Sequence, residues 1–166
     1  MSLRDAAAAL LLALAAAPAS PAPSDEALQN WFDDPFFQIS ASLPDCPLPA
    51  GPFITESEKR VQAHHRAERG TTCWLAKECD RPNSFAYDQD IAASFQRAAS
   101  GDSFPGTTLW ITVQGRVIYV EGCALQDATV AKVEALAHSL PYVQQVIAIV
   151  RTDPKSRPPY TLRQPR

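Results

Sequence analysis

TLWITVQGRVIYVEG, residues 108–122, is the most regular part of the chain, because it contains two runs of alternating apolar and amphipathic side chains around a glycine. Alternation with a period of two is the pattern of a half-buried strand. The stretch therefore predicts two antiparallel strands joined by a turn at residues 114–116. The side chains expected to face the core are Leu109, Ile111, Val113, Ile118 and Val120.

Helical patterns lie on both sides of this predicted hairpin. Upstream, residues 88–100 repeat apolar side chains at helical spacing, with Asp88 as the expected N-cap. Downstream, residues 128–140 carry one apolar stripe behind Asp127, a second expected N-cap. QQVIAIVR, residues 144–151, then predicts a third strand. Helix, strand, strand, helix, strand describes a small α+β sandwich with both helices on one face of a sheet.

Residues 87–150 resemble the BON (bacterial OsmY and nodulation) domain, a module with this same order of elements. The likeness rests on DQDIAASFQRA, IYVEG, TVAKVEALAHSL and YVQQVIAIV. The chain departs from the family at Tyr142, where a glycine is usual before the valine of the last turn. Because tyrosine adopts a positive φ only at a cost, we expect this turn to be built differently or the alignment to slip by a residue. The resemblance implies a membrane- or protein-contacting module of the bacterial envelope.

The chain begins with MSLRD followed by a short apolar block, AAAALLLALAA. This block is shorter than the roughly 20 residues that cross a bilayer, and the Ala-Pro-Ala at 17–19 fits a cleavage site. We therefore interpret residues 1–19 as a signal peptide and expect a periplasmic protein without a transmembrane segment in the mature chain. An alanine-rich surface helix is the alternative.

Residues 20–84 show no regular pattern and predict an irregular segment with one or two helices. NWFDDPFFQ, residues 30–38, holds four aromatic side chains, which we expect to anchor the segment on the domain at 85–151; an exposed contact site is the alternative. Thr55 and Glu58 form the pattern of a capping box. A polar helix is expected after it, ending at Gly70.

Four cysteines in an exported chain predict two disulfides, and three complete pairings exist. Each pairing links Cys123 to the N-terminal segment, which holds the other three cysteines. We favour Cys46 with Cys123 and Cys73 with Cys79. The second bridge requires a break in the helix, because six helical residues would separate these two cysteines by about 9 Å, beyond the roughly 7 Å limit.

Metal binding and catalysis are the more specific alternatives to a structural role for these residues. A metal site could add His64 and His65 to the cysteines, but adjacent side chains on a helix point about 100° apart. Asp33 and Asp34 beside the aromatic residues could suggest carbohydrate binding, although acidic residues before a proline are typical of turns. His138 lacks a recognisable nucleophile. We therefore expect neither an enzyme nor a cofactor or metal.

Binding is expected instead at two surfaces. Trp110 and Tyr119 should project from the sheet face opposite the helices, where either the N-terminal segment or a partner covers them. The proline-rich tail at 152–166 is basic and could meet anionic phospholipid headgroups, although a short solvated tail without a partner is the favoured interpretation of its composition. Its candidate contact residues, with the strand end before it, are Arg151, Lys155, Arg157 and Arg163.

The net charge of −3 makes nucleic acid an unlikely partner class. Together with the family resemblance, these features predict a non-enzymatic periplasmic protein that binds envelope proteins or anionic phospholipid. The alternative is an accessory subunit of a larger envelope assembly such as a secretion system.

Overall fold

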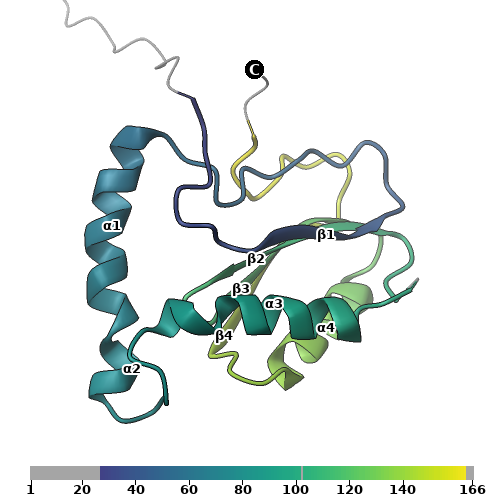
Figure 1. Ribbon diagram of the computed structural model, residues 1–166. Helices are drawn as coiled ribbons and strands as arrows, with labels where there is room; N and C mark the ends of the chain where they lie inside the picture. Colours follow the sequence, from purple (N-terminus) through teal and green to yellow (C-terminus); the bar gives the residue numbers. More distant parts are fainter. Residues whose placement is uncertain (1–26, 102, 164–166) are drawn as a thin grey trace, which may run out of the picture.

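The structure is a computed structural model that describes residues 27–101 and 103–163; the expected signal peptide lies outside this range. A four-stranded sheet in the order β1-β2-β3-β4 forms its centre, and two helices, α3 and α4, cover one face (Figure 1). The strands are β1 (Phe36–Ala41), β2 (Thr107–Gln114), β3 (Val117–Ala124) and β4 (Gln145–Arg151). The helices are α1 (Glu56–Gly70), α2 (Thr72–Leu75), the 3-10 helix η1 (Ser84–Tyr87), α3 (Asp88–Ala98) and α4 (Asp127–Ser139).

The expected α+β order is confirmed from α3 to β4, and the core lies between the sheet and its two helices. β2 pairs antiparallel with β3, and β3 pairs parallel with β4 across the α4 crossover. The alternating strand residues predicted to face inward are all buried, together with Ile91 and Phe95 of α3 and Val133 and Ala137 of α4. The period-two and helical patterns therefore identified the core correctly.

The N-terminal segment contributes a strand that the sequence analysis missed. β1 pairs antiparallel with β2, so Phe37 lies opposite Ile111 at the edge of the sheet. The register shifts between Gln38 and Ser40, which marks a β-bulge. The bulge interrupts the alternation, and for this reason a six-residue strand was not recognisable by its period.

Gly115 and Arg116 form the two-residue turn between β2 and β3, with φ angles of 60° and 69°. Two positive φ values are the signature of a type I′ hairpin turn. The carboxylate of Asp88 accepts hydrogen bonds from both turn amides, at 2.6 Å from Gly115 N and 2.8 Å from Arg116 N. The expectation that Asp88 is an N-cap was wrong: it is the first residue of α3, and Tyr87 is the N-cap. Its side chain joins the helix to the hairpin instead.

Burial raises the pKa of Asp88 from 3.8 to about 6, against the opposing effect of the two amide donors. The folded state therefore holds the proton more readily than the unfolded chain does. The resulting stabilisation is complete below about pH 4 and is lost as the pH rises through about 6. At about 1.36 kcal/mol per pKa unit, the loss is about 3 kcal/mol.

We expect the difference in unfolding free energy between the wild type and D88N to decrease by about 3 kcal/mol from pH 3 to pH 7. D88N is the reference because asparagine does not titrate, so contributions that the two proteins share cancel in the difference. Urea titrations at several pH values measure the difference. Parallel pH profiles for the two proteins would contradict the raised pKa.

Three local expectations have clear outcomes. The capping box is present, because Glu58 N donates to Thr55 Oγ1 while Thr55 N donates to the Glu58 carboxylate. Asp127 is not an N-cap, since α4 begins at Asp127 after Gln126, which makes no capping hydrogen bond. The expectation for Tyr142 was wrong as well, since its φ is 69°.

Contacts around Tyr142 hold this unfavourable backbone conformation. Its ring centroid lies 4.9 Å from that of Tyr87. Its carbonyl accepts a hydrogen bond of 2.7 Å from Arg116 Nε, and the neighbouring Gln144 N donates to Arg116 O. Side-chain packing and the hairpin turn thus stabilise at this position the conformation that glycine adopts without cost.

Gly122, the residue before Cys123, is required by close packing between strands. A Cβ at this position would lie 2.1 Å from the carbonyl oxygen of Thr108, and the φ of 139° already disfavours side chains. The glycine thus allows β3 to approach β2 closely beside the disulfide. Within the described part of the chain, no helix is long and apolar enough to cross a membrane.

Candidate functional site

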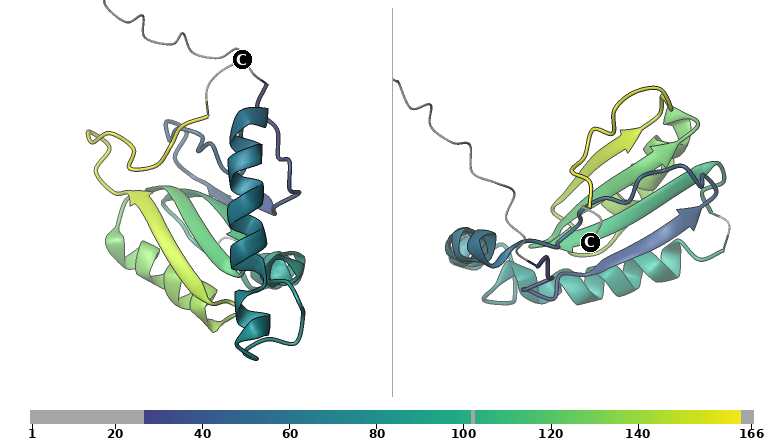
Figure 2. Two further views of the ribbon diagram at one scale, coloured as in Figure 1. Left: turned by 90° about the vertical axis from the view of Figure 1, so that its left-hand side faces the viewer. Right: turned by 90° about the horizontal axis from the view of Figure 1, so that it is seen from above.

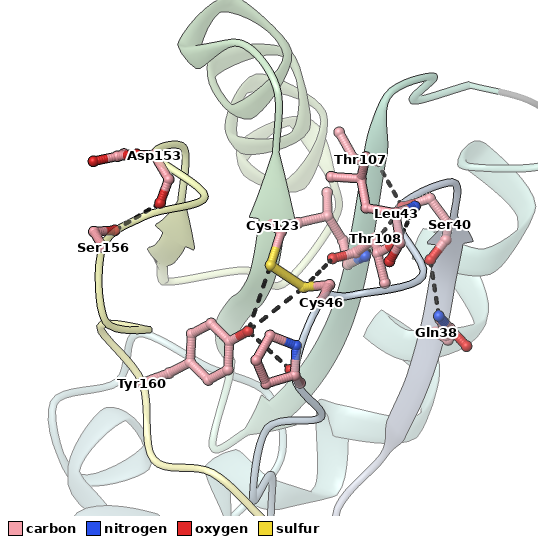
Figure 3. Close-up of a disulfide and its surroundings, with 12 residues drawn as sticks. Gln38, Ser40, Leu43, Cys46, Thr107, Thr108, Cys123, Asp153, Ser156 and Tyr160 are labelled. Carbon is pink, nitrogen blue, oxygen red and sulfur yellow. Dashed lines mark hydrogen bonds between the residues drawn. A yellow bond between two sulfur atoms is a disulfide. The ribbon is translucent and has the colours of Figure 1, made fainter.

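The structure pairs Cys46 with Cys123 and Cys73 with Cys79, as the sequence analysis favoured. The first bridge joins the loop after β1 to the end of β3, on the sheet face opposite α3 and α4 (Figure 3). Cys123 is 3% exposed, and the hydroxyl of Tyr160 lies 3.6 Å from Cys46 Sγ and 3.8 Å from Cys123 Sγ. This bridge therefore links the loop after β1 to β3, and Tyr160 of the C-terminal segment packs against it.

The C-terminal segment folds back over the same face around Tyr160, so the expectation of a solvated tail is wrong for residues 160–163, whereas residues 153–157 are exposed. Tyr160 is 7% exposed and donates a hydrogen bond of 2.8 Å to Pro47 O. Further along, Leu162 pairs with Pro49, and Ala50 N donates to Thr161 O. The tail and the loop after β1 together cover the face (Figure 1).

This cover lies over the sheet face on which Trp110 and Tyr119 were expected to bind a partner. Trp110 is 8% exposed and is not available to a partner. Tyr119 and Glu121 are half-buried, and burial raises the pKa of Glu121. Burial also raises the pKa of the Tyr160 hydroxyl. The expectation that a segment of the chain itself covers this face is thus met for Trp110, and the C-terminal segment takes part in addition to the N-terminal one.

The basic residues do not form one surface. The guanidinium of Arg163 lies 3.9 Å from the ring of Phe53 and 5.2 Å from that of Phe36, so it is engaged within the fold. Arg151 is half-buried. Of the four basic candidates, only Lys155 and Arg157 are exposed, on a turn after β4.

The aromatic residues of 30–38 pack within the fold, as expected. Beside them lies an ion pair between Arg66 and Asp34, which the sequence did not reveal. Arg66 of α1 donates two hydrogen bonds to the carboxylate of Asp34, of 2.8 and 2.6 Å, and the Asp34 side chain is only 3% exposed. The guanidinium lies 4.2 Å from the ring of Phe32 and 3.9 Å from that of Phe85. Gln114 Nε2 donates a further bond of 2.9 Å to Asp34. Asp34 thus has a structural role.

The second disulfide closes a short loop, residues 73–79, that presents two large apolar side chains to solvent. Trp74 is 46% exposed and Leu75 is 75% exposed. The helix breaks after Leu75, as the predicted bridge requires, and Lys77 has a φ of 61°. Cys73 is buried at the base of the loop, and its carbonyl accepts a hydrogen bond of 2.8 Å from Glu78 N.

Both ends of this loop are fixed. At its start, α1 leads directly into α2, and Arg69 donates a hydrogen bond of 3.1 Å to the carbonyl of Gln114. At its end, the hydroxyl of Tyr87 accepts bonds from Asp80 N and Arg81 N, at 2.9 and 2.7 Å. The exposed apolar pair is therefore carried on a rigid support rather than on a mobile loop.

Sequence reasoning missed Trp74 and Leu75 because it treated CWLAKEC only as a question of disulfide geometry. A signal was present, however. A loop of seven residues closed by a bridge is too small to bury both of its large apolar side chains. The residues between the cysteines could thus have been proposed as a contact site once the pairing was favoured.

Two small pockets lie on either side of Arg69, with volumes of about 110 and 130 Å³. Both are smaller than the roughly 300 Å³ at the lower end of ordinary small-molecule sites. The first is lined by Gln62, His65, Arg66, Arg69, Phe85 and Gln114. The small size of both pockets favours surface contacts over the binding of a small substrate.

The histidines lie away from the cysteines, on the exposed side of α1. His64 Nδ1 is 3.5 Å from Glu68 Oε1, and His65 Nδ1 is 3.9 Å from Glu68 Oε2. Donor atoms of the three residues thus lie within 4.8 Å of one another, closer than their angular spacing suggested. Because all four cysteines form disulfides, the expected alternative of a cysteine–histidine metal site is excluded.

Comparisons with known proteins add no family to this description. A scan against models of protein families, a search of curated proteins and a search of solved structures found no match to the chain. The resemblance of residues 87–150 to the BON domain consequently rests on its motifs and on the order of its elements.

Proposed function

We propose that the protein is a non-enzymatic component of the bacterial envelope that docks to a protein partner through the loop at residues 73–79. The observation that carries this proposal is the exposure of Trp74 and Leu75 on a loop fixed by a disulfide. Tryptophan is among the residues most enriched at the energetic centres of protein interfaces. A loop that is already ordered also loses less conformational entropy on binding.

The cysteines and the apolar leader support an oxidising compartment as part of this proposal. Two disulfides persist in an oxidising space such as the periplasm and are rare in the cytosol. Export through the signal peptide at residues 1–19 agrees with this chemistry. The resemblance to the BON domain supports an envelope role in particular, and a subunit of a larger envelope assembly is a suitable class of partner.

A protein partner is favoured over a phospholipid surface for two reasons. The exposed loop carries mixed charge, with Lys77 beside Glu78 and Asp80 just beyond, so it does not attract anionic headgroups. The exposed basic turn with Lys155 and Arg157 follows β4 at the opposite end of the molecule from α2 (Figures 1 and 2). A flat membrane would not easily contact both features at once.

We expect W74A/L75A to reduce the capture of partners by at least tenfold, because truncating an interface centre costs about 2 kcal/mol or more. The measurement is quantitative mass spectrometry after cross-linking in intact envelopes of the producing cell. V61A is the matched control, since Val61 is 61% exposed on the neighbouring helix α1. Both variants should unfold at nearly the wild-type denaturant concentration, because these side chains are not buried.

Equal capture by W74A/L75A and the wild type would contradict the docking proposal. Flotation with vesicles of anionic phospholipid distinguishes the lipid alternative. Binding to vesicles that is lost in K155A/R157A and retained in W74A/L75A would assign the contact to a membrane through the basic turn, in place of a protein partner at the loop.

A further inference from the structure

The outer edge of β4 forms one margin of the sheet, away from the loop at 73–79. β4 pairs with β3 on one side, and among the described residues no backbone hydrogen bond reaches its other side. Figure 2 shows this strand at the margin of the sheet. Unpaired amides and carbonyls in a row are a template for another strand.

The two edges of the sheet differ in how they are protected. At the β1 edge, the bulge between Gln38 and Ser40 breaks the register, and the side-chain amide of Gln38 donates a hydrogen bond of 3.0 Å to Ser40 O. β4 has none of these devices. From Val146 to Val150 it contains five apolar residues in succession, without proline, charge or bulge, and all five are partly exposed.

We propose that β4 pairs with β4 of a second copy of this chain, antiparallel and centred on Ala148. The strand QVIAIVR is self-complementary about that residue. Ile147 would lie opposite Ile149 of the other copy, and Val146 opposite Val150. Gln145 would face Arg151, so no like charges meet. Directly opposed β-branched residues are favourable cross-strand pairs.

The faces of the sheet are consistent with this pairing. Val146, Ala148 and Val150 pack against the core beneath α4, whereas Ile147 and Ile149 alternate onto the opposite face. Directly opposed residues of an antiparallel pair share a face, so a twofold axis perpendicular to the sheet keeps the helices of both copies together. The product is a continuous eight-stranded sheet in which the exposed apolar edge is buried.

Self-complementarity favours a second copy over an unrelated segment. A twofold interface must match a surface with itself, and this strand does so at every position from 145 to 151. The inference is independent of the docking loop, which lies elsewhere on the molecule. It therefore stands or falls separately from the proposed function.

Sedimentation of the protein, with its disulfides intact, tests the proposal. We expect the wild type to double its mass with a dissociation constant on the order of 10 µM. In I147K/I149K, the lysine at position 147 of each copy would face the lysine at position 149 of the other copy. These two pairs of like charges should weaken association by at least tenfold. I147E/I149K removes the same apolar atoms but places opposite charges across the axis, so it should associate at least tenfold more tightly than I147K/I149K. Added salt should reduce the difference in dissociation constant between these two variants, because it screens the charges.

A control and a second readout keep the test decisive. V61K adds a lysine on α1, away from the edge, and should leave the association unchanged. In the wild type, amide hydrogen exchange at residues 145–151 should slow as concentration rises, which requires no variant to fold. A monomeric mass at about 100 µM would overturn the proposal. Equal association of the two charge variants, or protection of these amides that does not depend on concentration, would overturn it as well.

Discussion

C46A/C123A is expected to lower the free energy of unfolding by about 4.5 kcal/mol, one of the two largest effects predicted for this protein. The bridge closes a sequence separation of 77 residues, and the entropy that it removes from the unfolded chain grows with the logarithm of loop length. Native contacts depend on it too, because it lies beneath Tyr160 and joins the loop after β1 to β3. A small domain with a limited core relies heavily on such a link.

The other disulfide provides the matched control. Cys73 and Cys79 are only six residues apart, so C73A/C79A should cost about 2.4 kcal/mol by the same reasoning. Urea denaturation monitored by tryptophan fluorescence measures both losses. A smaller loss for the long bridge than for the short one would show that loop entropy does not govern the role of Cys46 and Cys123.

The two disulfides have different roles, one in stability and the other in the proposed function. The buried bridge at Cys123 holds the cover of the sheet in place, whereas the bridge at Cys73 shapes the loop that carries Trp74. We therefore assign the larger share of the stabilisation by disulfides to the first bridge, and the shaping of the proposed docking loop to the second. The sequence could indicate this division, because only one cysteine lies in the regular C-terminal domain.

The sequence predicted the elements whose patterns are local. The helices and strands from α3 to β4 followed from periodicity, and the α1 start followed from Thr55 and Glu58. The short edge strand β1 did not, because its bulge at Gln38 breaks the alternation. The folded-back C-terminal segment was missed for another reason: Tyr160 contacts residues that are 37 to 114 positions away in the sequence, which no local pattern reveals.

The candidate site was predictable in part. The cysteine pairing was favoured among three possible pairings because the residues after Cys79 made a break in the helix plausible. The exposure of Trp74 depends on where α1 and α2 lie, and that placement depends on Arg66 and Asp34, 32 residues apart in the sequence. An ion pair between distant residues leaves no periodic signal, so sequence reasoning considered Asp34 as a carbohydrate-binding candidate and favoured a turn residue.

R66A is expected to lower the free energy of unfolding by about 3 to 5 kcal/mol, because it leaves the buried carboxylate of Asp34 without its cation. The ring contacts of the guanidinium with Phe32 and Phe85 are lost as well. R66K keeps the charge but cannot make the two parallel hydrogen bonds, so it should fall between R66A and the wild type. Urea denaturation of the three proteins gives the comparison.

A double-mutant cycle separates the ion pair from the packing of Arg66. D34N removes the charge that R66A leaves unpaired, so D34N/R66A should be more stable than R66A alone; strict additivity of the two changes would contradict the ion-pair argument. D90N, in the exposed pair of Arg81 and Asp90, should change stability far less. Because Arg66 fixes α1 to the N-terminal segment and α1 continues into α2, R66A should also speed amide exchange in residues 72–75. Unchanged exchange there would show that the disulfide alone holds the docking loop in place.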